Sequence, residues 1–159
     1  MPHPVLVSTD VGDLGPDVRR LFEDLARRRP ERRPYVSGEC VPLLDVFETE
    51  RSIDLVLDLP GLKADAVRIL IRHGVVLIVG EKERPEPGLG QPASFHLVER
   101  DFGRFARAVR VHAAVDAGRA TARLQSGELR ISLPKIPERR GREILVPIDT
   151  GAEAGGSGA

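Results

Sequence analysis

The sequence that decides the fold is Phe95-His96-Leu97-Val98-Glu99-Arg100-Asp101-Phe102-Gly103-Arg104-Phe105-Ala106-Arg107. Its first half predicts a short apolar strand flanked by charged residues, and Gly103 marks the turn into a second strand. Alternate residues of a strand point to opposite faces, so Arg107 shares one face with Phe105, Val109 and Val111.

Arg107 is therefore expected to point toward a core, where it needs a partner. A buried guanidinium left unpaired would cost several kcal/mol, so we expect a carboxylate beside it, which a second subunit could supply. The alternative is that both faces of the strand are exposed and that Arg107 only extends its charged end into water.

Composition limits the classes of partner. The chain has 159 residues, which suits one domain with tails, and its 24 basic residues balance its 24 acidic residues. Because these charges balance, the chain has no overall electrostatic field that would attract nucleic acid or an anionic membrane. Tryptophan is absent and other aromatic residues are scarce, which weakens any proposal based on base stacking or an aromatic cage.

Cysteine content and hydropathy indicate the compartment. The single Cys40 excludes an internal disulfide and a CxxC metal site, and it agrees with a reducing environment. No apolar run approaches the roughly 18 residues of a membrane span, and the N-terminus lacks the pattern of a signal peptide. We expect a soluble protein of the cytoplasm.

The N-terminal part predicts one amphipathic helix over residues 16–28. Its apolar residues recur at helical spacing: Leu14, Val18, Leu21, Phe22 and Leu25. A helix of about thirteen residues is marginal alone in water, so it needs a surface to pack on. The arginine- and proline-rich residues 27–34 end it and form a solvated linker, for which nucleic-acid binding is a weak alternative.

From Val41 onward the apolar period is two, for about ninety residues. The pattern predicts seven to nine short strands without helices between them, which indicates an antiparallel two-sheet sandwich. Residues 75–79 are apolar throughout, as in a strand covered on both faces. Residues 80–94 contain three prolines and three glycines and predict a long mobile loop.

The tail carries an apolar patch, Ile144-Leu145-Val146-Pro147-Ile148, between a charged segment and a terminus of small residues that we expect to be disordered. When the chain is extended, Val146 and Ile148 point the same way, and such a strand can add to an exposed sheet groove. The alternative is a last strand of the same domain.

No catalytic, metal or cofactor site emerges from the sequence. The four histidines, His3, His73, His96 and His112, lack ligand-like spacing and are expected to be solvated. Adjacency of Ser94, His96 and Asp101 is no evidence for a catalytic triad. Residues 88–93 match GxGxxA but lack the strand before and the helix after that would form a dinucleotide site.

Several motifs, taken together and in order, resemble the small heat-shock proteins of the α-crystallin/Hsp20 family. They are Pro42–Thr49, Asp58–Gly61, Leu77–Lys82, Phe95–Arg100, Phe102–Phe105, Ala122–Leu129 and Leu133–Lys135. They cover about residues 41–136. One departure is Glu128, where the family usually has an aliphatic residue; Glu128 points outward by strand parity and should alter only the surface.

The resemblance implies an immunoglobulin-like β-sandwich over residues 41–136, with an N-terminal arm over 1–40 and a C-terminal extension over 137–159. It implies a dimer in which a strand at residues 94–98, carried by the loop 80–94, is exchanged onto residues 43–48 of the partner. The implied dimer interface comprises Phe95, His96, Leu97, Glu99, Arg100 and Arg107. Arg107 matches the family's inward arginine at that contact.

The function that the resemblance implies is an ATP-independent chaperone that binds unfolding proteins and suppresses their aggregation. The apolar residues of the arm, Leu14, Val18, Leu21, Phe22 and Leu25, would bind clients. The tail motif, with Val146 and Ile148 or in a second register Ile144 and Val146, would dock on a neighbouring dimer. Expected partners are other copies and unfolded proteins, without cofactor, nucleic acid or membrane. The alternative is a co-chaperone-like adaptor domain that binds one folded partner.

Overall fold

The computed structural model describes residues 14–30, 40–137, 143 and 145–149. Within this part of the chain it contains one α-helix, α1 (Gly15–Arg28), and seven strands. The strands are β1 (Leu44–Glu48), β2 (Ser52–Asp58), β3 (Val67–Arg72), β4 (Val75–Lys82), β5 (Gly103–Arg110), β6 (Thr121–Gln125) and β7 (Glu128–Pro134). Short 3₁₀ turns lie at η2 (Ala64–Ala66), η3 (Pro87–Gly90) and η4 (Ala117–Arg119).

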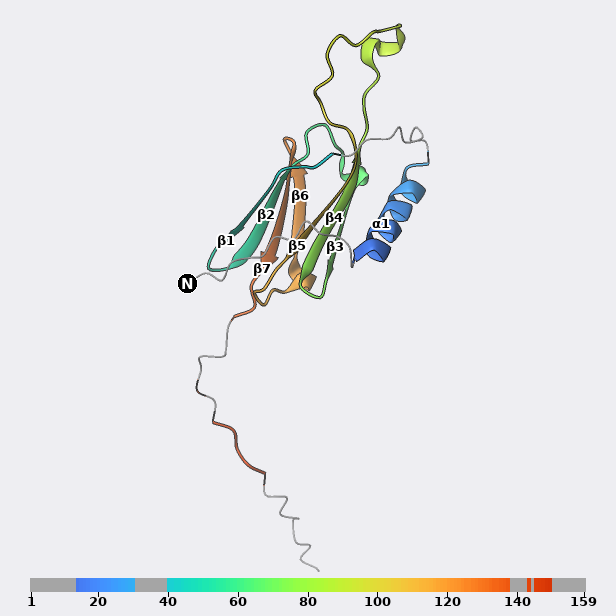
Figure 1. The fold of residues 1–159 in the computed structure, drawn as a ribbon. Coiled ribbons are helices and arrows are strands. Elements are labelled where there is room, and N and C mark those ends of the chain that lie inside the picture. The colour runs from blue at the N-terminus through green and yellow to red at the C-terminus, as the bar shows by residue number, and fades with distance from the viewer. Residues whose placement is uncertain (1–13, 31–39, 138–142, 144, 150–159) are drawn as a thin grey trace, which may run out of the picture.

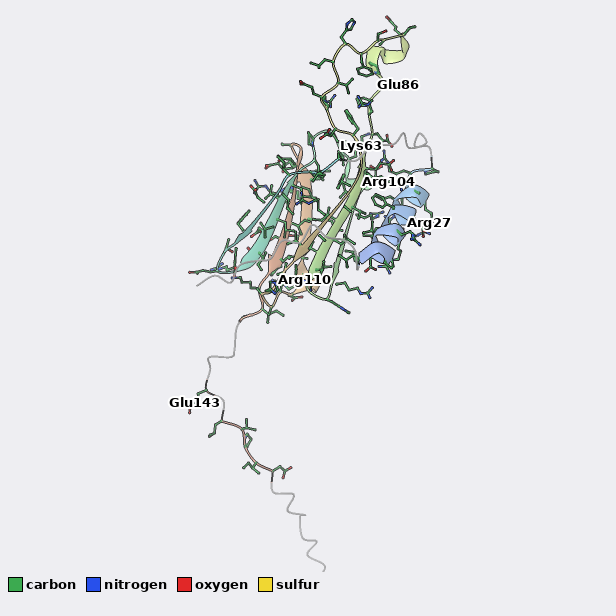
Figure 2. The ribbon with its side chains drawn as sticks, viewed as in Figure 1. Arg27, Lys63, Glu86, Arg104, Arg110 and Glu143 are labelled. Atoms are coloured by element: carbon green, nitrogen blue, oxygen red, sulfur yellow. The ribbon has the colours of Figure 1, made fainter. Side chains whose placement is uncertain are left out.

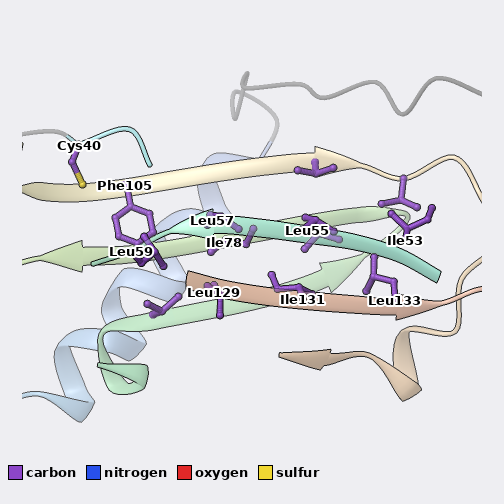
Figure 3. Close-up of a cluster of buried hydrophobic side chains, with 14 residues drawn as sticks. Cys40, Ile53, Leu55, Leu57, Leu59, Ile78, Phe105, Leu129, Ile131 and Leu133 are labelled. Atoms are coloured by element: carbon purple, nitrogen blue, oxygen red, sulfur yellow. The ribbon is translucent and has the colours of Figure 1, made fainter. Parts of the chain in front are cut away.

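The strands form two antiparallel sheets that pack face to face, with the orders β1-β2-β7-β6 and β3-β4-β5. Alternate residues of each strand enter the space between the sheets, as the period of two predicts. The resulting inter-sheet core includes Ile53, Leu55 and Leu57 of β2, Val76 and Ile78 of β4, Phe105 and Val109 of β5, and Leu129, Ile131 and Leu133 of β7 (Figure 3). The predicted antiparallel sandwich is confirmed.

Two tight turns join neighbouring strands where the sequence predicts them. His73 and Gly74 between β3 and β4 both have positive φ, at 50° and 74°. Ser126 and Gly127 between β6 and β7 have φ of 53° and 78°. Positive φ at both central residues gives a turn whose twist matches that of the flanking strands.

Helix α1 packs on the outer face of the β3-β4-β5 sheet (Figure 1). Leu21 and Leu25 are 8% and 1% exposed and contact a second apolar cluster that includes Val75, Leu77, Val79 and Ala108. Strand β4 is therefore covered by the opposite sheet on one side and by α1 on the other, which explains its continuous apolar run. The predicted helix and the doubly covered strand are both confirmed.

The strand predicted at Phe95–Val98 is absent from the single chain. Strand β4 extends to Lys82, and residues 83–102 form a loop without strands that projects from one end of the sandwich (Figure 1). The prediction was wrong for one chain because the apolar pattern reports strand propensity, whereas a strand also needs a neighbouring edge to bond with.

Candidate interaction surfaces

Arg107 lies on the inter-sheet side of β5, between the buried Phe105 and Val109. The alternative that this strand is exposed on both faces is therefore wrong. The guanidinium is half-buried, and its Nη1 donates a hydrogen bond of 2.5 Å to the backbone carbonyl of Pro42. Its Nε is buried without a hydrogen-bond partner among the described residues. A carboxylate from a second subunit stays a prediction.

The segment that leads into β1 runs beside β5. The backbone N–H of Cys40 donates to the carbonyl of Arg104 at 3.3 Å, and the Cys40 thiol donates to the carbonyl of Gly103 at 3.5 Å. Desolvation by burial raises the pKa of the Cys40 thiol, so at neutral pH it stays protonated and behaves as a small apolar side chain. These contacts place the β1 edge of one sheet next to the β5 edge of the other.

Strand β1 offers an open edge in the part of the chain that the structure describes. It pairs with β2 on one side only, and apolar side chains on and before it are exposed: Val41 by 69%, Leu43 by 73% and Phe47 by 46%. An unpaired, apolar edge can accept a further strand. This is the edge that the resemblance to small heat-shock proteins implies as the acceptor of an exchanged strand.

The projecting loop carries the other predicted dimer residues. Phe95, Leu97 and Val98 are 55%, 74% and 53% exposed, and His96, Glu99 and Arg100 are exposed as well. Figure 2 marks Glu86 on this loop, away from the sandwich. The loop and Arg107 are thus two separate parts of the predicted interface within one chain, and nothing in the described part of the single chain joins them.

The base of the loop is held by cations that lie over aromatic rings. Arg84, Arg100 and Lys82 lie 4.5, 4.9 and 5.3 Å from the centre of the Phe102 ring. Contacts of this kind contribute about 0.5–1 kcal/mol each at exposed sites. Because Arg84 also lies over Phe95, at 5.5 Å, they hold the two limbs of the loop together around a pocket of about 190 Å³.

The apolar arm residues share one face of α1, but the structure does not leave them free. Leu21 and Leu25 are buried on the sheet, and Leu14, Val18 and Phe22 are half-buried against the same cluster. Any client contact through them requires the helix to leave the sheet.

Ion pairs hold α1 along strand β3. Asp24 Oδ2 accepts a hydrogen bond of 2.9 Å from Arg68 Nε, and Asp17 Oδ1 accepts one of 3.3 Å from Arg72 Nη1. Beyond the end of the helix, Arg29 pairs with Glu83 at 3.2 Å. Sequence reasoning missed these pairs. The available signal was the spacing of Asp17 and Asp24, seven residues apart on one side of the apolar stripe.

The Asp24 pair predicts that helix docking depends on pH. Desolvation acts to raise the pKa of the Asp24 carboxyl, but the charges of Arg28 and Arg68 outweigh it and hold the pKa below its ordinary value. Arg28 lies on the same helix, so only the part of the lowering that Arg68 supplies belongs to docking. That part stabilises docking fully at pH values above the ordinary pKa of about 3.9, and the stabilisation is lost as the pH falls through the docked-state pKa.

Amide-exchange protection of residues 15–28, measured relative to β2, should therefore fall as the pH is lowered from 7 to 3. In Asp24→Asn the protection should already be lower at pH 7 and should change less with pH. Equal pH profiles of protection in the unaltered chain and in Asp24→Asn would contradict the role of the Asp24 carboxylate in docking.

The described tail residues lie away from the sandwich, as Figure 2 shows for Glu143. Leu145, Val146 and Ile148 are 92%, 74% and 88% exposed, and residues 143 and 145–149 form no strand. The alternative of a last strand in the same domain is therefore wrong. Ile144, the first residue of the second register, lies outside the described residues.

Groups that could bind a metal ion are dispersed in the described part of the chain. His73, His96 and His112 are exposed, and His3 lies outside the described residues. No cluster of three or more histidine, cysteine or acidic side chains suited to a metal ion occurs in the ranges described. In the same ranges, no helix has the length and apolar character needed to cross a membrane.

Comparison with known proteins agrees with the fold and its surfaces. The model of the Hsp20/alpha crystallin family matches residues 45–149. Heat shock protein 16 of Schizosaccharomyces pombe is 29% identical over 130 residues, which span 82% of this chain and 91% of that protein. Small heat shock protein C2 of Rickettsia felis is 30% identical over 71% of this chain and 74% of its own length. The chain spans only 57% of a 21.9 kDa heat shock protein of Oryza sativa, at 36% identity.

Solved structures give the same result. Heat shock protein 16.0 of S. pombe superimposes with a TM-score of 0.59 at 29% identity, over 70% of this chain and all of that chain. A small heat-shock protein of Xylella fastidiosa, described as having a distinct high order structure, gives a TM-score of 0.58 at 29% identity, also over 70% of this chain and all of its own. The chain therefore belongs to the Hsp20/α-crystallin family of small heat-shock proteins, which are molecular chaperones and generally not enzymes.

Proposed function

We propose that this chaperone is an ATP-independent holdase of the cytoplasm that binds apolar segments of unfolding proteins and suppresses their aggregation under stress. One observation carries the proposal: exposed apolar side chains gather on three segments outside the inter-sheet core, namely the β1 edge, the projecting loop and the tail. Large apolar surface that a chain leaves uncovered marks a site of interaction. Holding a client requires only binding energy, so no nucleotide chemistry is needed.

The dimer we propose forms by exchange of residues 94–98 onto the open edge of β1 in a partner. This segment has five residues, the same length as β1, and its exposed Phe95 and Leu97 would meet the exposed Leu43 and Phe47. Pairing would supply hydrogen-bond partners to backbone N–H and C=O groups that are open in the single chain, on β1 and in residues 94–98. We also propose that the partner supplies the carboxylate that Arg107 lacks.

Larger assemblies are proposed to form through the tail. Because β5 lies next to β1, the other edges of the two sheets, β3 and β6, border the opposite side of the sandwich. Ile69 and Ile71 of β3 and Leu124 of β6 are only half-buried there. Val146 and Ile148 of a neighbouring chain point the same way when extended and can fill this border.

Replacing both Val146 and Ile148 with glycine should therefore reduce the mass of the assembly toward that of a dimer. Burying one aliphatic side chain contributes about 1.5–3 kcal/mol, and the loss is multiplied over many linked tails. Mass measured by light scattering during size-exclusion chromatography checks the prediction. Leu145→Gly is the matched control and should leave the mass unchanged, while Ile144→Gly tests the second register. An unchanged mass in the double variant would refute the tail role.

The holdase proposal is tested by heating a model client with and without the purified chain, in the absence of ATP, and recording light scattering. We expect suppression by the full chain and a clear loss of it when residues 1–34 are deleted. Deletion without effect would refute the client role of the arm, and aggregation that the full chain leaves unchanged would refute holdase activity. A strictly monomeric protein would instead favour the adaptor alternative.

A further inference from the structure

We propose that the outer face of the β3-β4-β5 sheet is itself a client-binding site, specific for amphipathic segments with acidic residues, and that helix α1 is its resident occupant. The inference rests on the proposed holdase function and names a site for it. The client would displace α1 and take its place on the sheet, and the displaced helix would expose the arm residues that the holdase proposal assigns to client contact, so deletion of residues 1–34 removes that second contact.

The apolar floor of this site is separate from the inter-sheet core. Val75, Leu77, Val79 and Ala108 point toward α1, whereas their neighbours along the same strands point between the sheets. Removal of the helix would expose this floor and leave the contacts between the two sheets in place. A face that is apolar and can be uncovered without unfolding suits a reversible binding site.

One border of the site is basic. Arg68 and Arg72 on β3 have the same strand parity as Leu70, which contacts the helix-side cluster, and their present partners are carboxylates of α1. Seven residues of helix span roughly 10 Å and four residues of strand roughly 13 Å, so the Asp17 and Asp24 carboxylates match the two guanidinium groups. Arg68 Nη2 is buried and has no hydrogen-bond partner among the described residues, so it can donate to a further acceptor group.

The remaining charges give the site a direction. Arg29, just after the helix, lies near Glu83 at 3.2 Å and Asp65 at 4.0 Å. The site therefore fits a helix with acidic residues in its first and third turns and a basic residue just past its end; the acid in the first turn and the base at the end are placed as the helix dipole favours. A client with this order would reproduce the charged contacts that α1 makes with the β3 side.

On the β5 side, α1 occupies the face only partly. The Arg104 guanidinium lies 4.8 Å from the centre of the Phe22 ring, and Glu81 is the cross-strand neighbour of Arg104. A groove of about 370 Å³ on this side is lined by α1 residues, Val18 and Phe22 among them, and by Arg104 of the sheet. Arg104 lies between the sheet and α1 in Figure 2. Since α1 alone is marginally stable, a longer or bulkier segment that also covers the β5 side of the face can compete with it.

The test uses the full chain and a fluorescent peptide with the sequence of residues 14–29. Leu25→Asp removes the most deeply buried side chain of α1 and should free the site, so this variant should bind the peptide at least about tenfold more tightly than the unaltered chain. Arg19→Asp changes an exposed position of the same helix and should bind as weakly as the unaltered chain.

Charge reversal tests the basic border. Arg68→Glu with Arg72→Glu, added to Leu25→Asp, should weaken peptide binding about three- to tenfold, because two partly exposed ion pairs become repulsive. A peptide that carries Asp17→Arg and Asp24→Arg should restore the binding. A misfolded variant could not give such a rescue. If the original peptide and the charge-reversed peptide bind equally to Leu25→Asp with and without the two arginine reversals, the proposal is overturned.

A client and a second copy are distinguished by competition. Reduced, unfolded α-lactalbumin, an acidic protein, should displace the peptide from the Leu25→Asp variant. Displacement by added unaltered chain alone would assign the site to α1 of another copy and overturn the client role.

Failure of the site and failure of the holdase function give different results. If no peptide binds while the Leu25→Asp variant still suppresses aggregation, the proposed site is refuted and the holdase function stands. If the unaltered chain does not suppress aggregation, the holdase function is refuted, whether or not the peptide binds.

Discussion

The Leu25→Asp variant is expected to lose its docked helix while keeping its sandwich. Leu25 is 1% exposed and packs on the outer cluster, where burial of a leucine contributes about 1.5–3 kcal/mol. Aspartate would lose that contribution and place a carboxylate among Val75, Leu77 and Val79. A loss of about 3 kcal/mol or more shifts the docking equilibrium by roughly a hundredfold.

Two measurements check this prediction. Amide-exchange protection of residues 15–28 should fall at least tenfold, whereas protection of β2 and β7 should stay within about a factor of two. Arg19→Asp, with the same new side chain at an exposed position, should change neither. Equal loss of protection in the helix and in the inter-sheet strands would contradict the independence of the two apolar clusters.

The helix and the strands could be predicted because each has an apolar period that one chain satisfies by itself. Leu21 and Leu25 recur at helical spacing, and their burial in the structure is on the side that this spacing predicts. The continuous apolar run of β4 predicted cover on both faces, although the sequence did not name α1 as one of the two covers.

Other features could not be predicted because they depend on which segments meet. The ion pairs Asp24–Arg68 and Asp17–Arg72 join residues 44 and 55 positions apart. Charged residues at such distances follow no local period, so only the docking of α1 on β3 reveals them. Residues 95–98 show the reverse case: their strand pattern is clear, but within the described part of one chain no edge receives it.

Replacing Arg107 with methionine is expected to weaken the proposed dimer strongly while changing the stability of the single fold by only about 1 kcal/mol. The variant loses the bond to the Pro42 carbonyl, but it also removes a buried Nε that has no partner in the described chain. Methionine has a similar length and suits the apolar neighbours Phe105 and Val109. Within one chain these changes nearly offset each other.

Between chains the change has no compensation if a partner's carboxylate pairs with Arg107. Loss of one member of a buried, hydrogen-bonded charge pair costs about 2–5 kcal/mol, so the dimer dissociation constant should rise about thirtyfold or more.

This constant is obtained by measuring mass against protein concentration. The measurement is made in a chain that also carries Val146→Gly and Ile148→Gly, which remove the tail contacts. Arg110→Met, at an exposed position of the same strand, is the matched control and should leave the constant unchanged. An Arg107→Met variant that dimerises as tightly as the control would show that Arg107 serves only its own Pro42 carbonyl, because an orphaned carboxylate at the interface could not leave the affinity intact.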